Sequence, residues 1–214
     1  MGRYFRRTIE LYRYLPFKTA TALTICDASR ALLHPYFLPS YAQTGEDRII
    51  ESYVDQNRTG FYVDIGCHHP FYKSNTFSLY LRGWRGVVVD GNSELIALFK
   101  RFRPRDAAIC AVVSDQERPV TFTVAKTSEL STVSSKFERE RIGKSGVKER
   151  VTVDAITLQT VMEKSGVPST FDLLSIDVFR SYSVMDRIFL DASCLTPLSD
   201  LQKSSHIRVG DAVG

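Results

Sequence analysis

The chain has 214 residues, of which 43% are hydrophobic and 24% are charged, and its formal net charge is +4. This composition suits one α/β domain with a sizeable core, and it excludes fibrous, collagen-like and globally disordered proteins. The charge is local, because residues 1–18 hold five basic residues and one acidic residue and so account for all of it. We therefore expect no nucleic-acid partner.

The first 40 residues are predicted to form a basic helical extension. Ile9 and Tyr12 lie at helical spacing, and an apolar run over residues 19–26 follows. That run is far shorter than the ~20 apolar residues of a membrane-spanning helix, and no signal-type cleavage sequence accompanies it. We expect no transmembrane segment, and at most weak contact of the basic N-terminus with a membrane surface.

The cysteines are spaced far apart and form no CxxC pair. Two of them lie in or beside apolar runs, where a thiol is most often a small core residue. This pattern is typical of a reducing compartment and predicts a cytoplasmic protein. The cysteines are Cys26, Cys67, Cys110 and Cys194.

The domain proper is predicted to open with a helix capped by Thr44, with Asp47 three residues later. Residues 60–92 follow, in which two apolar runs of strand length each end in an aspartate, Asp64 and Asp90. A short amphipathic run joins them. This is the sequence pattern of a βαβ unit with a ligand at its carboxyl edge.

The rest of the chain alternates predicted helices and strands. The expected elements, in chain order, are a helix capped by Ser93, a buried strand over 107–113, an alternating strand over 120–124, a surface excursion over 125–150, a strand over 151–153, a helix capped by Thr157 and ending at Gly166, and a strand over 171–178. This alternation predicts an α/β fold with a mostly parallel, doubly wound sheet.

The predicted carboxyl edge of the sheet carries the residues expected to bind a cofactor. Asp64 and Gly66 follow the first strand, and a missing Cβ at Gly66 would let a ligand approach the backbone. Asp90 ends the second strand, where nucleotide-binding sheets place the acid that accepts ribose hydroxyls. Pro70 replaces the last glycine of a G-x-G-x-x-G loop, which disfavours a dinucleotide. The pattern favours a nucleoside cofactor without phosphates, such as S-adenosylmethionine.

Several short motifs stand out between Tyr41 and Val178. They are Tyr41–Asp47, Val63–Pro70, Ser74–Thr76, Gly83–Gly86, Val89–Asp90, Ala111–Asp115 and Leu174–Val178. Together these motifs resemble the FkbM-type S-adenosylmethionine-dependent methyltransferases. The resemblance implies a Rossmann-like methyltransferase fold over residues 41–178, and typically O-methylation of a sugar or polyketide hydroxyl, hence a small-molecule or glycan acceptor.

The candidate site residues lie in or directly beside these motifs. His68, His69 and Asp177 are candidates for the base that removes the acceptor proton, and Phe71 or Tyr72 for a cation–π contact with a sulfonium. Loop hydrogen bonding is the alternative role for both histidines, and no metal site is expected. The expected cofactor-binding residues are Asp64, Gly66, Cys67, His68, Asp90, Gly91, Asn92 and Ser114. Asn75 is expected to cap a helix, and Trp84 to pack in the core.

The segment after Val178 departs from the family pattern. Family members continue with Glu-Gly, whereas this chain reads Phe179-Arg180-Ser181-Tyr182. We expect residues 179–214 to form a divergent tail that lacks the last strands. Three function classes stay open: an active methyltransferase, an NAD-dependent enzyme on a related sheet, and an inactive methyltransferase-like protein.

Overall fold

The computed structural model describes residues 3–33, 40–55, 57–127, 131–135, 138–139, 146–166, 168, 171–178 and 208–209. Helices and strands alternate over most of this length, as the sequence predicts. In chain order the elements are α1 (Arg3–Tyr14), α2 (Phe17–Leu33), α3 (Glu46–Tyr53), β1 (Phe61–Ile65), α4 (Phe77–Leu81), β2 (Arg85–Asp90), α5 (Ser93–Phe102), β3 (Ala107–Cys110), β4 (Val112–Val113), β5 (Arg118–Ala125), β6 (Val147–Ile156), α8 (Leu158–Ser165), β7 (Leu173–Ile176) and β8 (Arg208–Val209).

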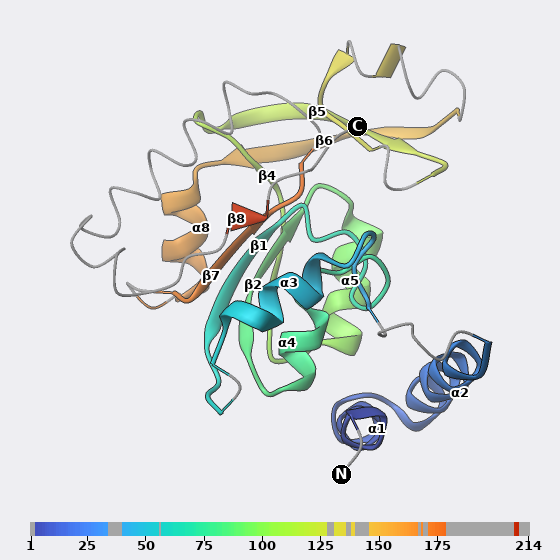
Figure 1. The fold of residues 1–214 in the computed structure, drawn as a ribbon. Helices are drawn as coiled ribbons and strands as arrows, with labels where there is room; N and C mark the ends of the chain where they lie inside the picture. Colours follow the sequence, from blue (N-terminus) through green and yellow to red (C-terminus); the bar gives the residue numbers. More distant parts are fainter. Residues whose placement is uncertain are drawn as a thin grey trace.

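A parallel sheet forms the centre of the fold (Figure 1). Its strand order is β3-β2-β1-β7-β8, and every neighbouring pair runs parallel. The chain steps outward from β1 through β2 to β3, and β7 later returns to the other side of β1. This reversal beside β1 is a topological switch point, where sheets of this type bind ligands at their carboxyl edge. The mostly parallel, doubly wound sheet is confirmed.

Alternate residues of each strand pack on opposite faces of the sheet. Val63 of β1 belongs to one buried cluster, together with Val161 of α8. Tyr62 and Val88 belong to a second cluster on the other face, with side chains from α3, α4 and α5. Trp84 is a member of this second cluster and is 1% exposed, as the sequence predicts. Helices therefore cover both faces, which explains why the central strands are largely apolar.

A second, three-stranded sheet corrects the prediction for residues 107–124. β6 pairs in parallel with β4 and antiparallel with β5, so β5 is not part of the parallel sheet. The strand predicted over 107–113 breaks at Ala111, whose N–H donates to the carbonyl of Asp90 at the end of β2. Beyond that point β2 offers no further partner, and the chain pairs with β6 instead. β6 begins at Val147, inside the range predicted as a surface excursion.

The predicted cap of α3 is displaced by one residue. Gly45 is the N-cap, with φ of 100°, and as a glycine it has no side chain that could bond to the helix start. The N–H and hydroxyl of Thr44 instead both bond to the Glu46 carboxylate. Asp47 is 1% exposed and reaches back to accept from the N–H of Tyr41 at 2.8 Å. Asp47 therefore holds the incoming chain rather than pairing with Thr44.

The predicted N-cap is wrong for α5 and confirmed for α8. α5 is capped by Asn92 and not by Ser93, because the Asn92 side chain accepts from N–H groups of the first helical turn. The prediction for α8 is confirmed: the Thr157 hydroxyl accepts from the N–H of Thr160 at 3.1 Å, and Gly166 ends the helix with φ of 61°.

The predicted N-terminal extension forms a helix pair that packs on the domain. Leu11 and Leu15 share a buried cluster with Phe77 of α4. The guanidinium of Arg105 lies 3.9 Å from the ring centroids of both Tyr14 and Tyr80, which joins α1 to α4. Within the described part of the chain, no helix combines the length and the apolar character that crossing a bilayer requires.

Little of the predicted tail is described. Residues 179–207 and 210–214 lie outside the described residues. Most of the expectation that the last strands are missing concerns these residues. The described part of the tail is β8, a short strand that extends the sheet in parallel beside β7.

Candidate functional site

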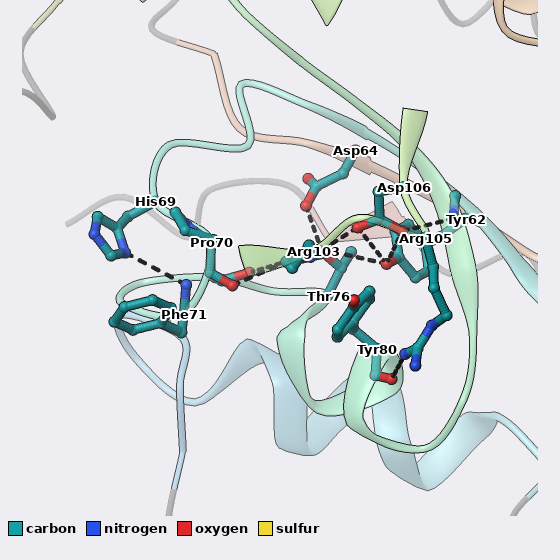
Figure 2. Close-up of polar contacts among 12 residues, drawn as sticks. Tyr62, Asp64, His69, Pro70, Phe71, Thr76, Tyr80, Arg103, Arg105 and Asp106 are labelled. Carbon is teal, nitrogen blue, oxygen red and sulfur yellow. Dashed lines mark hydrogen bonds and ion pairs between the residues drawn. The ribbon is translucent and has the colours of Figure 1, made fainter. Parts of the chain in front are cut away.

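Asp64 lies inside the domain rather than open at a strand tip. It precedes the last residue of β1, is 2% exposed, and accepts from the Thr76 hydroxyl at 2.7 Å (Figure 2). Burial raises the pKa of Asp64, while the Thr76 hydroxyl and the charge of Arg103 act in the opposite direction. Part of its hydrogen-bonding capacity is therefore already used within the protein.

A buried arginine organises the polar groups behind Asp64 (Figure 2). Arg103 is 0% exposed, and its Nε lies 2.7 Å from a carboxylate oxygen of Asp106. Nη2 donates to the hydroxyls of Tyr62 and Thr76, so Arg103 is linked to Asp64 through Thr76. Nη1 donates to the loop that follows β1, at the Pro70 carbonyl and the Ser74 hydroxyl.

Sequence reasoning missed this network. Arg103 follows α5 and stands among other basic residues, the usual pattern of exposed cations at a helix end. Its partners Thr76 and Tyr62 are 27 and 41 residues away in the chain. No local pattern links such residues, so only the packing of α5 on the sheet reveals the pairing.

Asp90 ends β2 and lies at the carboxyl edge of the parallel sheet. In the β1–β2 register Asp64 lies opposite Val88, so Asp90, two residues further, projects from the same face as Asp64. One Asp90 oxygen accepts from the N–H of His68 at 3.1 Å, and the other from the N–H of Asn92 at 2.8 Å. Burial, aided by the charge of Asp64, raises the pKa of Asp90 to about 6, and both backbone N–H groups oppose the shift.

Gly66 brings the ends of β1 and β7 together. Its φ is 76°, and a Cβ built on it would lie 2.0 Å from the carbonyl oxygen of Asp177. The N–H of Asp177 donates to the carbonyl of Ile65 at 2.8 Å. The neighbouring backbone therefore leaves no room for a side chain at residue 66. The sequence suggested only that a ligand needs this space. The Asp177 side chain is exposed beside this turn.

The two histidines occupy different environments. His68 has φ of 52° and holds Asp90 through its backbone N–H. Nδ1 of His69 accepts from the N–H groups of Phe71 and Tyr72, at 3.4 and 3.3 Å. Burial, followed by the charge of His68, lowers the pKa of His69 to about 4, so its ring is neutral at neutral pH. Loop hydrogen bonding, the alternative role, is thus observed for His69.

Phe71 and Tyr72, the candidates for a cation–π contact, also differ. Phe71 is 8% exposed and packs edge-on against Phe102, with ring centroids 5.5 Å apart. Tyr72 is 54% exposed. Only Tyr72 therefore presents most of its ring to the surroundings.

The four other predicted cofactor residues lie in different environments. Cys67 is 3% exposed within the apolar cluster on the Asp64 face, and burial raises the pKa of its thiol well above its usual value. Asn92 uses its side chain to cap α5. Ser114 follows β4 and belongs to the second sheet, where its N–H bonds to the Ile156 carbonyl. Gly91 packs against the ring of Phe122 on β5.

Phe122 of β5 closes over the backbone beside Asp90. A Cβ on Gly91 would lie 2.8 to 3.0 Å from atoms of the Phe122 ring. The ring is 8% exposed. The alternating pattern of residues 120–124 predicted a strand, but not that this strand would reach the end of β2 from another sheet.

Asn75 links the loop after β1 to β7. Its Nδ2 donates to the Ser175 hydroxyl at 3.4 Å, and it does not cap α4, whose N-cap is Thr76. Among the described residues, no group of three His, Cys, Asp or Glu side chains is placed to hold a metal ion. At the carboxyl edge the structure places the Asp90 carboxylate with its two backbone N–H partners and the exposed Asp177 side chain.

The parallel sheet, its switch point beside β1 and the acid at the end of β2 define a Rossmann-like fold of the methyltransferase type. Residues 64–178, just over half of the chain, match the methyltransferase FkbM domain family, and the chain belongs to this family. The resemblance found in the sequence is thereby confirmed. No curated protein and no solved structure matched the chain.

Proposed function

We propose that the protein is an S-adenosylmethionine-dependent methyltransferase that methylates a hydroxyl group of a sugar or another small acceptor. Its family supports methyl transfer in general. The observation that carries the cofactor assignment is the position of Asp90, at the end of β2 and held by two backbone N–H groups. A nucleoside with two ribose hydroxyls matches an acid in this position.

The residues present fit such a cofactor. Each carboxylate oxygen has two lone pairs, and each oxygen of Asp90 accepts one backbone N–H, which leaves acceptor capacity for two hydroxyls. Asp64 contributes negative charge from the same face, while Thr76 holds it in place. S-adenosylmethionine supplies an electrophilic methyl group on a sulfonium centre. Tyr72, which is largely exposed, is the ring available to a sulfonium.

Asp177 is the base that we favour among the three candidates. His69 is less suitable, because its Nδ1 already accepts two N–H groups and its side chain is partly buried. The Asp177 carboxylate is exposed at the end of β7, beside the Gly66 turn. Removing a proton from the acceptor hydroxyl contributes about 10²- to 10⁴-fold to the rate.

Calorimetric titration of the full chain with S-adenosylhomocysteine tests the cofactor assignment. Asp90→Ala removes charge-assisted hydrogen bonds and should weaken binding by about 1.5–3 kcal/mol. Asp154→Ala is the matched control, since Asp154 is an exposed aspartate on β6, and it should leave the affinity unchanged. Equal affinity of the Asp90→Ala variant and the parent would remove Asp90 from the site.

Two further measurements separate the alternatives. Binding of NAD without binding of S-adenosylhomocysteine would support the NAD-dependent enzyme. Methyl transfer to a panel of sugar hydroxyls then separates an active enzyme from an inactive member of the family. In that assay Asp177→Asn should lower kcat but not the S-adenosylhomocysteine affinity, and an unchanged kcat would exclude Asp177 as the base.

A further inference from the structure

The outward side of the N-terminal helix pair carries large exposed apolar side chains. Phe17 and Ile25 on α2 are 73% and 64% exposed, and Ile9 and Tyr12 on α1 are 49% and 41% exposed. The inward side is buried, and Leu11, for example, is 0% exposed. The helices thus have one apolar face that packs on the domain and a second one that the domain leaves uncovered.

The four exposed side chains form one strip across both helices. Ile9 and Tyr12 are three residues apart and Phe17 and Ile25 eight apart, spacings that place each pair on one helix face. Tyr12 connects the pairs, because its ring centroid lies 5.6 Å from that of Phe17 and its hydroxyl lies 3.0 Å from the Thr21 hydroxyl. We call Ile9, Tyr12, Phe17 and Ile25 the apolar strip.

The exposed charges around the apolar strip are of one sign. Among the charged side chains described in α1 and α2, the exposed ones are Arg13 and Lys18, while Arg7, Glu10 and Asp27 are partly buried. Asp27 is engaged within the pair, since its carboxylate lies 2.8 Å from Nε of Arg7. An approaching surface therefore meets apolar groups and cations, and not exposed acids, on these described side chains.

We infer that the apolar strip binds the surface of an anionic lipid bilayer. Apolar side chains beside Lys and Arg are the features by which helices lie in the headgroup region, where anionic lipids attract the cations. The helices lie along such a surface and do not cross it, in keeping with their length and hydropathy. The inference is independent of the proposed cofactor.

Vesicle flotation of the full chain tests this inference. The protein should float with vesicles of phosphatidylcholine mixed with phosphatidylserine, more weakly with phosphatidylcholine alone, and less as salt is raised. The double variant Phe17→Ser, Ile25→Ser should bind the mixed vesicles about tenfold more weakly or worse. Lys18→Gln should weaken binding about fivefold.

The matched control is Ile49→Ser, because Ile49 is 56% exposed on α3 and lies outside the apolar strip. This variant should float like the parent. Circular dichroism melting confirms that each variant is folded. The inference is overturned if the parent does not float, if the double variant floats like the parent, or if light scattering shows a Phe17-dependent dimer without vesicle binding.

Discussion

Arg103 shows how much of this fold depends on one side chain. A guanidinium has five N–H donors and no acceptor, so burying it requires acceptors on several sides. The structure provides them on β1, on the loop after β1 and at Asp106. Burial lowers the pKa of Arg103, but the charge of Asp106, together with the hydrogen bond to Tyr62, outweighs it, so the pKa is raised. The arginine therefore stays charged and connects α5 to the site.

Replacing Arg103 should lower the free energy of unfolding. Arg103→Met leaves the buried Asp106 carboxylate without its cationic partner, which costs about 3–5 kcal/mol in the free energy of unfolding. Urea denaturation measures this loss. Arg101→Met is the control, since Arg101 is exposed in the same helix and should change stability by about 0.5 kcal/mol or less. A loss below about 1 kcal/mol for Arg103→Met would contradict a network centred on this residue.

Asp90 and His69 should affect the pH dependence of stability in opposite directions. The native pKa of Asp90 is about 6 against an ordinary 3.8, so the native state binds more protons and stability falls as pH rises from about 4 to 6. The native pKa of His69 is about 4 against 6.5, so the unfolded state binds more protons and stability rises over that window. In the parent protein these two contributions offset each other.

Single variants should reveal each contribution. The Tm of Asp90→Asn minus that of the parent should increase as pH rises from 4 to 6. The variant lacks the Asp90 contribution, which lowers stability over this range, and keeps the His69 contribution, which raises it. For His69→Gln the same difference should decrease over this range. Thermal melts at several pH values test this, and variant curves that run parallel to the parent would show that neither group titrates as described.

At the scale of elements, the turn after β1 is the point where three strands meet. The N–H of Gly66 bonds to Val89 of β2, and the Gly66 Cα faces the Asp177 carbonyl after β7. This close approach sets the spacing of the strand ends on either side of β1. The carboxyl edge that carries Asp90 and Asp177 is built on this contact.

Gly66→Ala should therefore lower the free energy of unfolding far more than replacing a glycine that has a positive φ but no close neighbour. A Cβ at Gly66 meets backbone at 2.0 Å, so the strand ends must separate, at a cost of about 3 kcal/mol or more. Gly166 has a similar φ of 61° with nothing within 4 Å, and Gly166→Ala should cost only about 1–2 kcal/mol. Urea denaturation compares them, and equal losses would argue against the strand contact.

At the scale of the whole molecule, the second sheet and the N-terminal helices both pack on the unit formed by the parallel sheet and its helices. The second sheet reaches it through Phe122 and through the ion pair between Lys148 of β6 and Glu94 of α5, at 2.7 Å. The N-terminal helices reach α4 through Arg105. The ion pair is exposed and contributes little, whereas the aromatic contacts exclude water and hold the units in place.

The amino-acid sequence by itself determined the helices and strands of the parallel sheet, its doubly wound order, the family and the acid at the end of β2. These features depend on local periodicity and on motifs that lie close together in the chain. Only the tertiary structure decided that Asp64 is bonded to Thr76 inside the domain, that Arg103 supports it, and that residues 112–124 leave the parallel sheet. Such outcomes depend on which distant groups packing brings together, and burial then requires each polar group to find a partner that no local pattern specifies.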